Sequence, residues 1–347
     1  SSTIADGSLY FDTKLYTGTG SAQSITGVGF SPDLLWLKDR TAAKNHHLFD
    51  AVRGANSFLK TNITNAESTG NRLTSFDNDG FTISSDSNIN TLNNGYVGWA
   101  WDAGDSTTTV AAGANGTNLP GTECKVRANP SVGFSIVKVD SPNGTEARVH
   151  GLNAKPEFII CKSTASSDSW HTYVGSYGYQ YYINLNMTGA ISGPSDQFGS
   201  QEPDSTYFYV KTNTGAGTNK SGGMIYYCFA PVEGYSSMGK YTGNGNASGP
   251  FIYTGFKIAW LMVKNASSGG ETWTIYDAAR DPHNLATNRL QPNSADAETS
   301  GTAARDKDLL SNGFKVRGSS GEQNTSGDNY IYLAFASNPF ASNGGLA

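Results

Sequence analysis

Residues 48–62 read LFDAVRGANSFLKTN, and a similar stretch returns at residues 275–293 as IYDAARDPHNLATNRLQPN. In both, an apolar pair precedes Asp-Ala, an Arg stands two residues after the Ala, and an Asn closes the stretch. Flanking blocks recur in the same order around both copies. They are LLWLK (34–38), DNDGFTI (77–83) and GYVGWAW (95–101) in the first copy, and AWLMVK (259–264), SNGFKV (311–316) and NYIYLAF (329–335) in the last. Such ordered self-similarity indicates an internal repeat.

A third, more divergent copy lies between these two. Its blocks are FIICK (158–162), TYVGSYG (172–178), YINLN (182–186), TYFYVKT (206–212) and MIYYCFA (224–230). Lys38 and Asn62 have counterparts in Lys162 and Asn186 at one constant separation. We therefore predict a tandem repeat. Its parts are module 1 (9–104), a linker or surface excursion (105–130), the divergent module 2 (131–233), module 3 (234–340) and a tail (341–347).

Composition and periodicity within the modules favour strands. The chain has 41 Gly, 12% aromatic residues and only 15% charged residues, which suits short strands joined by polar turns. In YVGWAW (96–101), alternate residues fall on opposite faces, as in a half-buried strand. The run Asp77-Asn78-Asp79-Gly80 is a hairpin signal. We predict an all-β chain of three tandem antiparallel β-sandwich-like modules, related by internal repetition and each self-sufficient.

Charge and targeting signals exclude several partners and locations. A net charge of −5, with no Lys/Arg-rich stripe, argues against nucleic acid. No apolar run approaches the roughly 20 residues that span a bilayer, so no membrane insertion is expected. The start of the chain has no signal-peptide pattern, which favours synthesis in a cytoplasm. The odd number of cysteines, 3, cannot form a complete disulfide framework.

The repeated Asp-x-x-Arg motif is the sharpest candidate site. Asp50 with Arg53, and Asp277 with Arg280, could clamp a polar ligand, because Arg offers a planar fork of donors. They could equally hold a loop against its own module, and we favour this structural interpretation because module 2 lacks the pair. The Asn that recurs in all three copies has the character of a turn residue bonding its own backbone. These residues are Asn62, Asn186 and Asn293.

A tyrosine-rich stretch in module 2, YVGSYGYQYYINLN (173–186), is the best candidate for recognition of a glycan or a partner. An extended strand would place its odd-numbered tyrosines on one face. Tyr suits such surfaces because a flat apolar ring carries a polar tip. The alternative is ordinary packing across strands or between modules. The four residues are Tyr173, Tyr177, Tyr179 and Tyr181.

Motifs for catalysis or metal binding are missing from the sequence. The histidines show no HExxH or CxxC-type spacing, and the Asp77–Gly80 run lacks the closing Glu of a calcium loop. No GxSxG, P-loop or GxGxxG context occurs. A pair of glycosidase carboxylates could exist, but no acidic residue is singled out. We therefore predict no catalytic residue, no metal and no cofactor.

The motifs together resemble a repeat of bacteriophage virion proteins, chiefly of marine and cyanobacterial phages, in tail-fibre-like and other appendage proteins. The marks are LYTGTGSAQSITGVGFSPDLLWLKDR (15–40), LFDAVRG (48–54), LTSFDNDGFTIS (73–84), YVGWAW (96–101), KYTGNG (240–245), YTGF (253–256), IYDAARD (275–281) and YIYLAF (330–335). The likeness covers residues 9–340. The family has no assigned catalytic residues to transfer, and module 2 departs most from its pattern.

The resemblance implies a non-enzymatic structural protein of the virion, in a tail fibre or a head or tail appendage that contributes to host attachment. By analogy it also implies homo-oligomers, trimers among them, and contacts with other virion proteins and with host surface polysaccharide. The virion is then the expected location. Two alternatives are a lectin-like carbohydrate-binding protein and a capsid decoration protein. A glycan-degrading enzyme is the weaker alternative.

Overall fold

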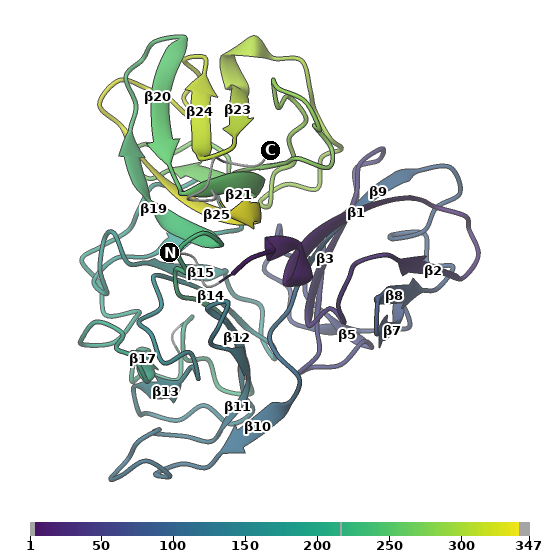
Figure 1. The fold of residues 1–347 in the computed structure, drawn as a ribbon. Helices are drawn as coiled ribbons and strands as arrows, with labels where there is room; N and C mark the ends of the chain where they lie inside the picture. Colours follow the sequence, from purple (N-terminus) through teal and green to yellow (C-terminus); the bar gives the residue numbers. More distant parts are fainter. Residues whose placement is uncertain (1–3, 216, 340–347) are drawn as a thin grey trace.

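The computed structural model describes residues 4–215 and 217–339, and its regular structure is almost entirely β-strand. Figure 1 shows three lobes around a common centre, in sequence order. The prediction of an all-β, antiparallel chain is confirmed. The expected tail, 341–347, lies outside the described residues. In the described part of the chain, no helix is long and apolar enough to cross a membrane.

The elements of each predicted module follow one another along the chain. Module 1 holds η1 (Gly7–Leu9), β1 (Phe11–Thr17), β2 (Gln23–Thr26), β3 (Leu34–Asp39), β4 (His47–Asp50), β5 (Ser57–Phe58), β6 (Ser68–Thr69), β7 (Leu73–Asp77), β8 (Gly80–Ile83) and β9 (Gly95–Trp101). After it come β10 (Thr107–Val110), β11 (Cys124–Asn129), β12 (Phe134–Val139), β13 (Ala147–Val149), β14 (Phe158–Ser163), β15 (His171–Val174), β16 (Ile183–Asn184), β17 (Tyr207–Tyr209) and β18 (Met224–Phe229). Module 3 holds β19 (Ser236–Thr242), β20 (Ser248–Tyr253), β21 (Phe256–Asn265), β22 (Thr274–Asp277), η2 (Ala303–Arg305), β23 (Asp306–Leu310), β24 (Gly313–Arg317) and β25 (Asn329–Pro339).

The same strand order occurs three times. In each large sheet the module's last strand lies between its first and second long strands, and all pairs are antiparallel. The orders are β1-β9-β3-β4, β12-β18-β14-β15 and β19-β25-β21-β22. A small sheet accompanies each large one: β2-β8-β7, β13-β17 and β20-β24-β23. The three large sheets thus share one order of their long strands, and internal repetition of the chain stays a prediction.

The two faces of each large sheet are buried against different partners. On one face, Leu35, Ile159 and Leu261 belong to three separate apolar clusters, one for each module. The side chains one residue later, Trp36, Ile160 and Met262, all belong to one central cluster shared by the three modules. Each module therefore has its own sandwich core and also contributes a sheet face to a common core.

This common core corrects the expectation of self-sufficient modules. The run YVGWAW, predicted to be half-buried, is buried on both faces. Exposing a central face would return Trp-rich apolar surface to water, at about 25 cal/mol for each Å². The chain therefore forms a compact trio and not a rod, with the three lobes joined at their apolar faces (Figure 1).

The segment 105–130, predicted to be a linker or surface excursion, contributes two strands to the second large sheet. β10 and β11 pair with each other, and β11 continues onto β12. The prediction missed them because TTTV and CKVRAN are short and carry few apolar residues. Cys124 and Val126 nevertheless point into the core of module 2. The linker interpretation is therefore wrong for Thr107–Val110 and Cys124–Asn129.

Candidate functional site

The Asp and Arg of the repeated motif form a buried ion pair at the end of β4. Arg53 Nε donates to Asp50 Oδ2 at 2.5 Å. The other guanidinium nitrogens donate to Glu67 Oε2 at 2.9 Å and to the Leu48 carbonyl oxygen at 3.0 Å. Burial alone would lower the pKa of Arg53, but the Asp50 carboxylate and its neighbours raise it, so the guanidinium stays charged.

Module 3 builds the same arrangement at the end of β22. Arg280 Nε donates to Asp277 Oδ2 at 2.5 Å, and the other nitrogens donate to Glu298 at 3.1 Å and to the Ile275 carbonyl at 2.9 Å. Glu298 also accepts two hydrogen bonds from Arg40 of module 1, at 2.8 and 2.9 Å. Because Asp277 and Arg280 are fully buried, the pair holds protein segments together and is closed to a ligand from solvent.

The carboxylates of Asp50 and Asp277 each also accept a hydrogen bond from a side chain of a neighbouring module. The Tyr227 hydroxyl of module 2 donates to Asp50 Oδ2 at 2.7 Å. Trp99 Nε1 of module 1 donates to Asp277 Oδ2 at 3.0 Å. Tyr227 and Trp99 occupy the same place in their sheets, as the strand registers show. The Asp-Arg motif is therefore a joint between modules.

At the third joint, between modules 2 and 3, apolar side chains and a tyrosine stand in the places of the charged residues. Val174 and Tyr177 stand where the motif has Asp and Arg, and Ile191 stands in the place of Glu67. All three belong to the central cluster or pack against it, as does Leu333 at the place of Tyr227 and Trp99. Module 2 thus lacks all the charged residues of the joint, and module 3 lacks the polar partner.

Backbone hydrogen bonds link the modules in a closed ring at the same places. They are Glu67 N–H to the Thr164 carbonyl (2.9 Å), Ile191 N–H to the Ala266 carbonyl (2.9 Å) and Glu298 N–H to the Arg40 carbonyl (3.0 Å). In each bond, the donor N–H lies in the loop that follows one module's Asp-x-x-Arg position. The acceptor carbonyl belongs to the residue directly after the second long strand of another module. The ring explains why Glu67 and Glu298 lie beside the buried arginines.

Aromatic rings close a second set of joints. The residue before the third long strand of each module directs a ring nitrogen at a backbone carbonyl of another module. The contacts are His46 Nε2 with Gln291 O (2.8 Å), Trp170 Nε1 with Lys60 O (3.0 Å) and Trp273 Nε1 with Asn184 O (3.0 Å). Since His46 Nδ1 accepts from Trp36 Nε1 at 2.9 Å, its proton lies on Nε2.

The recurring Asn positions these rings, which corrects the prediction that it bonds its own turn. Its side-chain oxygen accepts the backbone N–H of the ring-bearing residue, 16 to 20 positions earlier in the chain. The pairs are Asn62 with His46 (3.0 Å), Asn186 with Trp170 (2.8 Å) and Asn293 with Trp273 (3.0 Å). The Asn is structural, as predicted, but through a non-local contact.

Replacing Trp273 by Phe should lower the free energy of unfolding by roughly 1–2 kcal/mol, because the partly buried Asn184 carbonyl loses its donor while an aromatic ring remains. Trp170→Phe is the matched variant at another joint and should cost a similar amount. Urea unfolding of both variants measures the effect. Unchanged stability in both would show that these contacts do not hold the modules together.

The four tyrosines predicted to form a recognition face do not share one. β15 ends at Val174, and turn hydrogen bonds involving the N–H groups of Tyr177 and Tyr181 follow. Tyr173 is fully buried in the core of module 2, and Tyr179 packs against that core. Tyr177 packs against the central cluster instead. The assumption of an extended strand was wrong, because the chain turns at a glycine with positive φ between the tyrosines.

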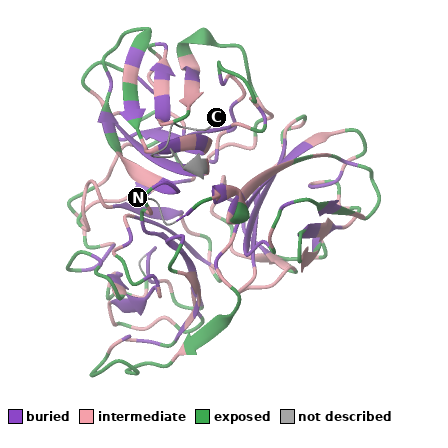
Figure 2. Ribbon diagram, viewed as in Figure 1, coloured by how far each residue is buried: buried purple, intermediate pink, exposed green. Residues whose placement is uncertain are grey.

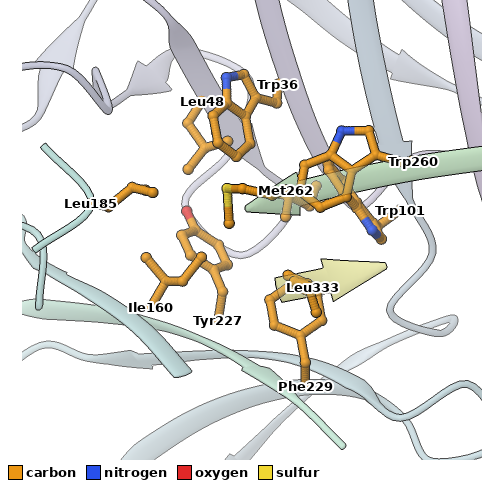
Figure 3. A pocket seen from close by; sticks show the side chains of 11 residues that line it. Trp36, Leu48, Trp101, Ile160, Leu185, Tyr227, Phe229, Trp260, Met262 and Leu333 are labelled. Atoms are coloured by element: carbon orange, nitrogen blue, oxygen red, sulfur yellow. The ribbon is translucent and has the colours of Figure 1, made fainter. Parts of the chain in front are cut away.

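A small cavity lies where the three large sheets meet. Figure 3 shows Trp36, Ile160 and Met262, one from each module, around it. Its volume is about 20 Å³ and its lining is apolar. A space of that size admits about one water molecule, and an apolar lining offers a water no partners. The cavity is a packing gap between the three large sheets, too small for an organic ligand.

His47, His150 and the three cysteines are buried, and burial favours the neutral form of each. Burial lowers the pKa of His47 to about 3 and that of His150 to about 4. The cysteines Cys124, Cys161 and Cys228 are buried, and burial raises the pKa of each thiol, which disfavours the reactive thiolate. Among the described residues, no three His, Cys, Asp or Glu side chains gather in a way that could hold a metal ion.

Sequence reasoning missed the partners of the motif: Glu67, Glu298, Trp99 and Tyr227. One signal was available, because a Glu follows the recurring Asn by five residues in modules 1 and 3 and an Ile takes that place in module 2. The loss of Glu together with Asp and Arg marks the three as one unit. The aromatic partners carried no comparable signal.

Comparison with known families agrees with a fold that extends over the whole chain. A family model described as a domain of unknown function, DUF7483, matches residues 6–339 in one piece. A search of curated proteins finds no match. The match includes all three sets of strands and the segment between the first two. The chain therefore belongs to the DUF7483 family.

Proposed function

We propose that this chain is a non-enzymatic structural protein of a bacteriophage particle, in a tail fibre or a head or tail appendage that contributes to attachment to the host surface. The observation that carries the proposal is that the recurring charged residues form ion pairs inside the protein and do not face solvent. Asp50, Arg53, Asp277 and Arg280 are all buried at joints between modules. Charged residues that connect modules, and are closed to ligands, are what we expect of a structural protein.

The joints suit a protein that must persist outside a cell. The three modules share one apolar core and are closed into a ring by backbone and side-chain hydrogen bonds. Cross-module contacts of this kind make local opening of one lobe costly. These contacts hold the modules together without disulfide bonds, since all three cysteines are free. Such a chain can fold in a reducing host cytoplasm and then function in the virion.

The expected partners follow from the resemblance to phage appendage proteins. They are other copies of this chain, trimers among them, other virion proteins and host surface polysaccharide. Nucleic acid and membrane are not expected partners. A capsid decoration protein is the alternative, since three lobes around a common centre would also suit a particle surface (Figure 1).

Mass spectrometry of purified particles of a phage that encodes this chain tests the proposal. The chain should be present in many copies per particle and should co-purify through a density gradient. Labelling with gold-tagged antibody then distinguishes tail, appendage and capsid. Absence of the chain from washed particles would refute the proposal. Release of reducing sugar from host polysaccharide by the purified chain would instead favour an enzyme.

A further inference from the structure

The small sheet β20-β24-β23 of module 3 turns two aromatic rings to solvent. On β20, Ile252 faces the module's core, while Phe251 and Tyr253 on the opposite face are 46% and 64% exposed. Figure 2 shows the alternation as exposed bands along β20 at the outer end of this lobe. Side chains two residues apart on a strand stand about 7 Å apart on one face.

The neighbouring strands leave these rings open and add polar groups beside them. Tyr253 lies opposite Gly313, which has no side chain to cover the ring, and Phe251 lies opposite Lys315. Lys315 Nζ donates to the Gly249 carbonyl at 2.8 Å. Asp308 lies opposite Lys315 in the same row, and its Oδ2 pairs with Nε of Arg317 at 2.9 Å. The face thus combines two rings with fixed donors and an acceptor.

Module 1 shows that the fold does not need aromatic residues at these places. By strand register, Ser24 and Thr26 of β2 correspond to Phe251 and Tyr253, and Gly80 corresponds to Gly313. There the Ser24 hydroxyl bonds within the sheet, to the Thr82 side chain at 2.8 Å. Since Ser and Thr satisfy the same backbone, packing does not explain the exposed rings of module 3.

We propose that the face of β20 carrying Phe251 and Tyr253 binds pyranose units of a surface polysaccharide. A sugar ring presents an apolar C–H face, which stacks on an aromatic ring, and a rim of hydroxyls, which suits Lys, Arg and Asp. Two rings flanked by charges are too small an apolar patch for a protein interface of about 800 Å² on each partner. The inference deepens the proposed attachment function and rests on it for its biological setting.

Affinity electrophoresis of the full chain through gels containing dextran, mannan, laminarin, alginate or chitin oligomers tests the site. At least one polymer should retard the wild-type chain. The double variant Phe251→Ser/Tyr253→Thr, which installs the module 1 residues, should weaken that binding about tenfold or more, as expected for two lost stacking contacts. Leu92→Ser is the matched control, since it removes another exposed apolar side chain, 61% exposed, and should leave binding unchanged.

Three results would overturn the inference: no retardation by any polymer, equal retardation of the double variant, or self-association that the double variant abolishes without any polymer binding. Circular dichroism checks that the double variant is folded, and Tyr253→Thr alone serves as a milder variant. Polymer binding by the purified chain does not depend on whether the chain is part of a virion. A chain absent from virions that still binds polymer refutes only the virion proposal, and a virion chain that binds none refutes only this site.

Discussion

Replacing Arg53 by Leu should lower the free energy of unfolding by roughly 3–5 kcal/mol. The guanidinium is buried and bonds Asp50, Glu67 and the Leu48 carbonyl. Its removal leaves the Asp50 carboxylate buried without a positive partner, bonded only by neutral donors: the Tyr227 hydroxyl and the backbone N–H groups of residues 52 and 53. The cost is that of an uncompensated buried charge, which exceeds the loss of side-chain packing. Guanidinium unfolding measures it.

The chain supplies its own control in the apolar joint between modules 2 and 3. The variant that copies this joint is Asp50→Val/Arg53→Tyr/Glu67→Ile/Tyr227→Leu. It removes the charges as a set, so it should recover most of the stability lost by Arg53→Leu, to within about 1–2 kcal/mol of wild type. Buried ion pairs replaced together by well-packed apolar groups often cost little. A quadruple variant no more stable than Arg53→Leu would show that unpaired charge is not the cause.

Recurrence made the strands and the motif predictable from sequence. Identical residues at matched places, such as Asp50 and Asp277, reveal themselves by alignment of the chain with itself. Their partners are different residues from other modules. Tyr227 is 177 positions from Asp50, and Trp99 is 178 positions from Asp277. A contact between unlike residues far apart leaves no periodic signal, so the joints became visible only in three dimensions.

The common core was missed for a related reason. Alternation in YVGWAW was interpreted as one apolar face, although no residue in it is strongly polar. The small residues Gly98 and Ala100 face the module's own core, where space is short: a Cβ on Gly98 would stand 3.0 Å from Leu37 Cδ2. The large ones, Trp99 and Trp101, face the other modules. Small residues on a strand can therefore mark a crowded buried face and not an exposed one.

The stability of the wild-type chain relative to a Lys264→Met variant should rise by roughly 2–3 kcal/mol between pH 8 and pH 10. Lys264 is fully buried, and its Nζ donates to the Asn265 carbonyl at 2.5 Å. Burial lowers the pKa of Lys264 to about 8. Lys38 and Lys162, at the same place in the other modules, are equally buried, and burial lowers the pKa of each to about 8.

The sign follows from proton binding. Below pH 8 the lysine is charged in both states, and its burial destabilises the fold. Between about pH 8 and 10 the folded chain has released this proton while the unfolded chain, with an ordinary lysine pKa near 10.5, still holds it. The unfolded state then binds more protons, so stability rises with pH. Buried thiols and phenols have raised pKa values and act in the opposite direction, but they are common to both chains and cancel in the difference.

Urea unfolding of the two chains at pH 7, 8, 9 and 10 gives this difference directly. Lys162→Met should behave like Lys264→Met, because the Nζ of Lys162 also donates to backbone carbonyls, at 2.8 and 3.1 Å. Lys240→Met is the matched control: it removes an exposed lysine and should run parallel to wild type. If the curves of all three variants run parallel to wild type, the buried lysines do not lose their protons in the folded chain, and their carbonyl contacts alone must compensate the buried charge.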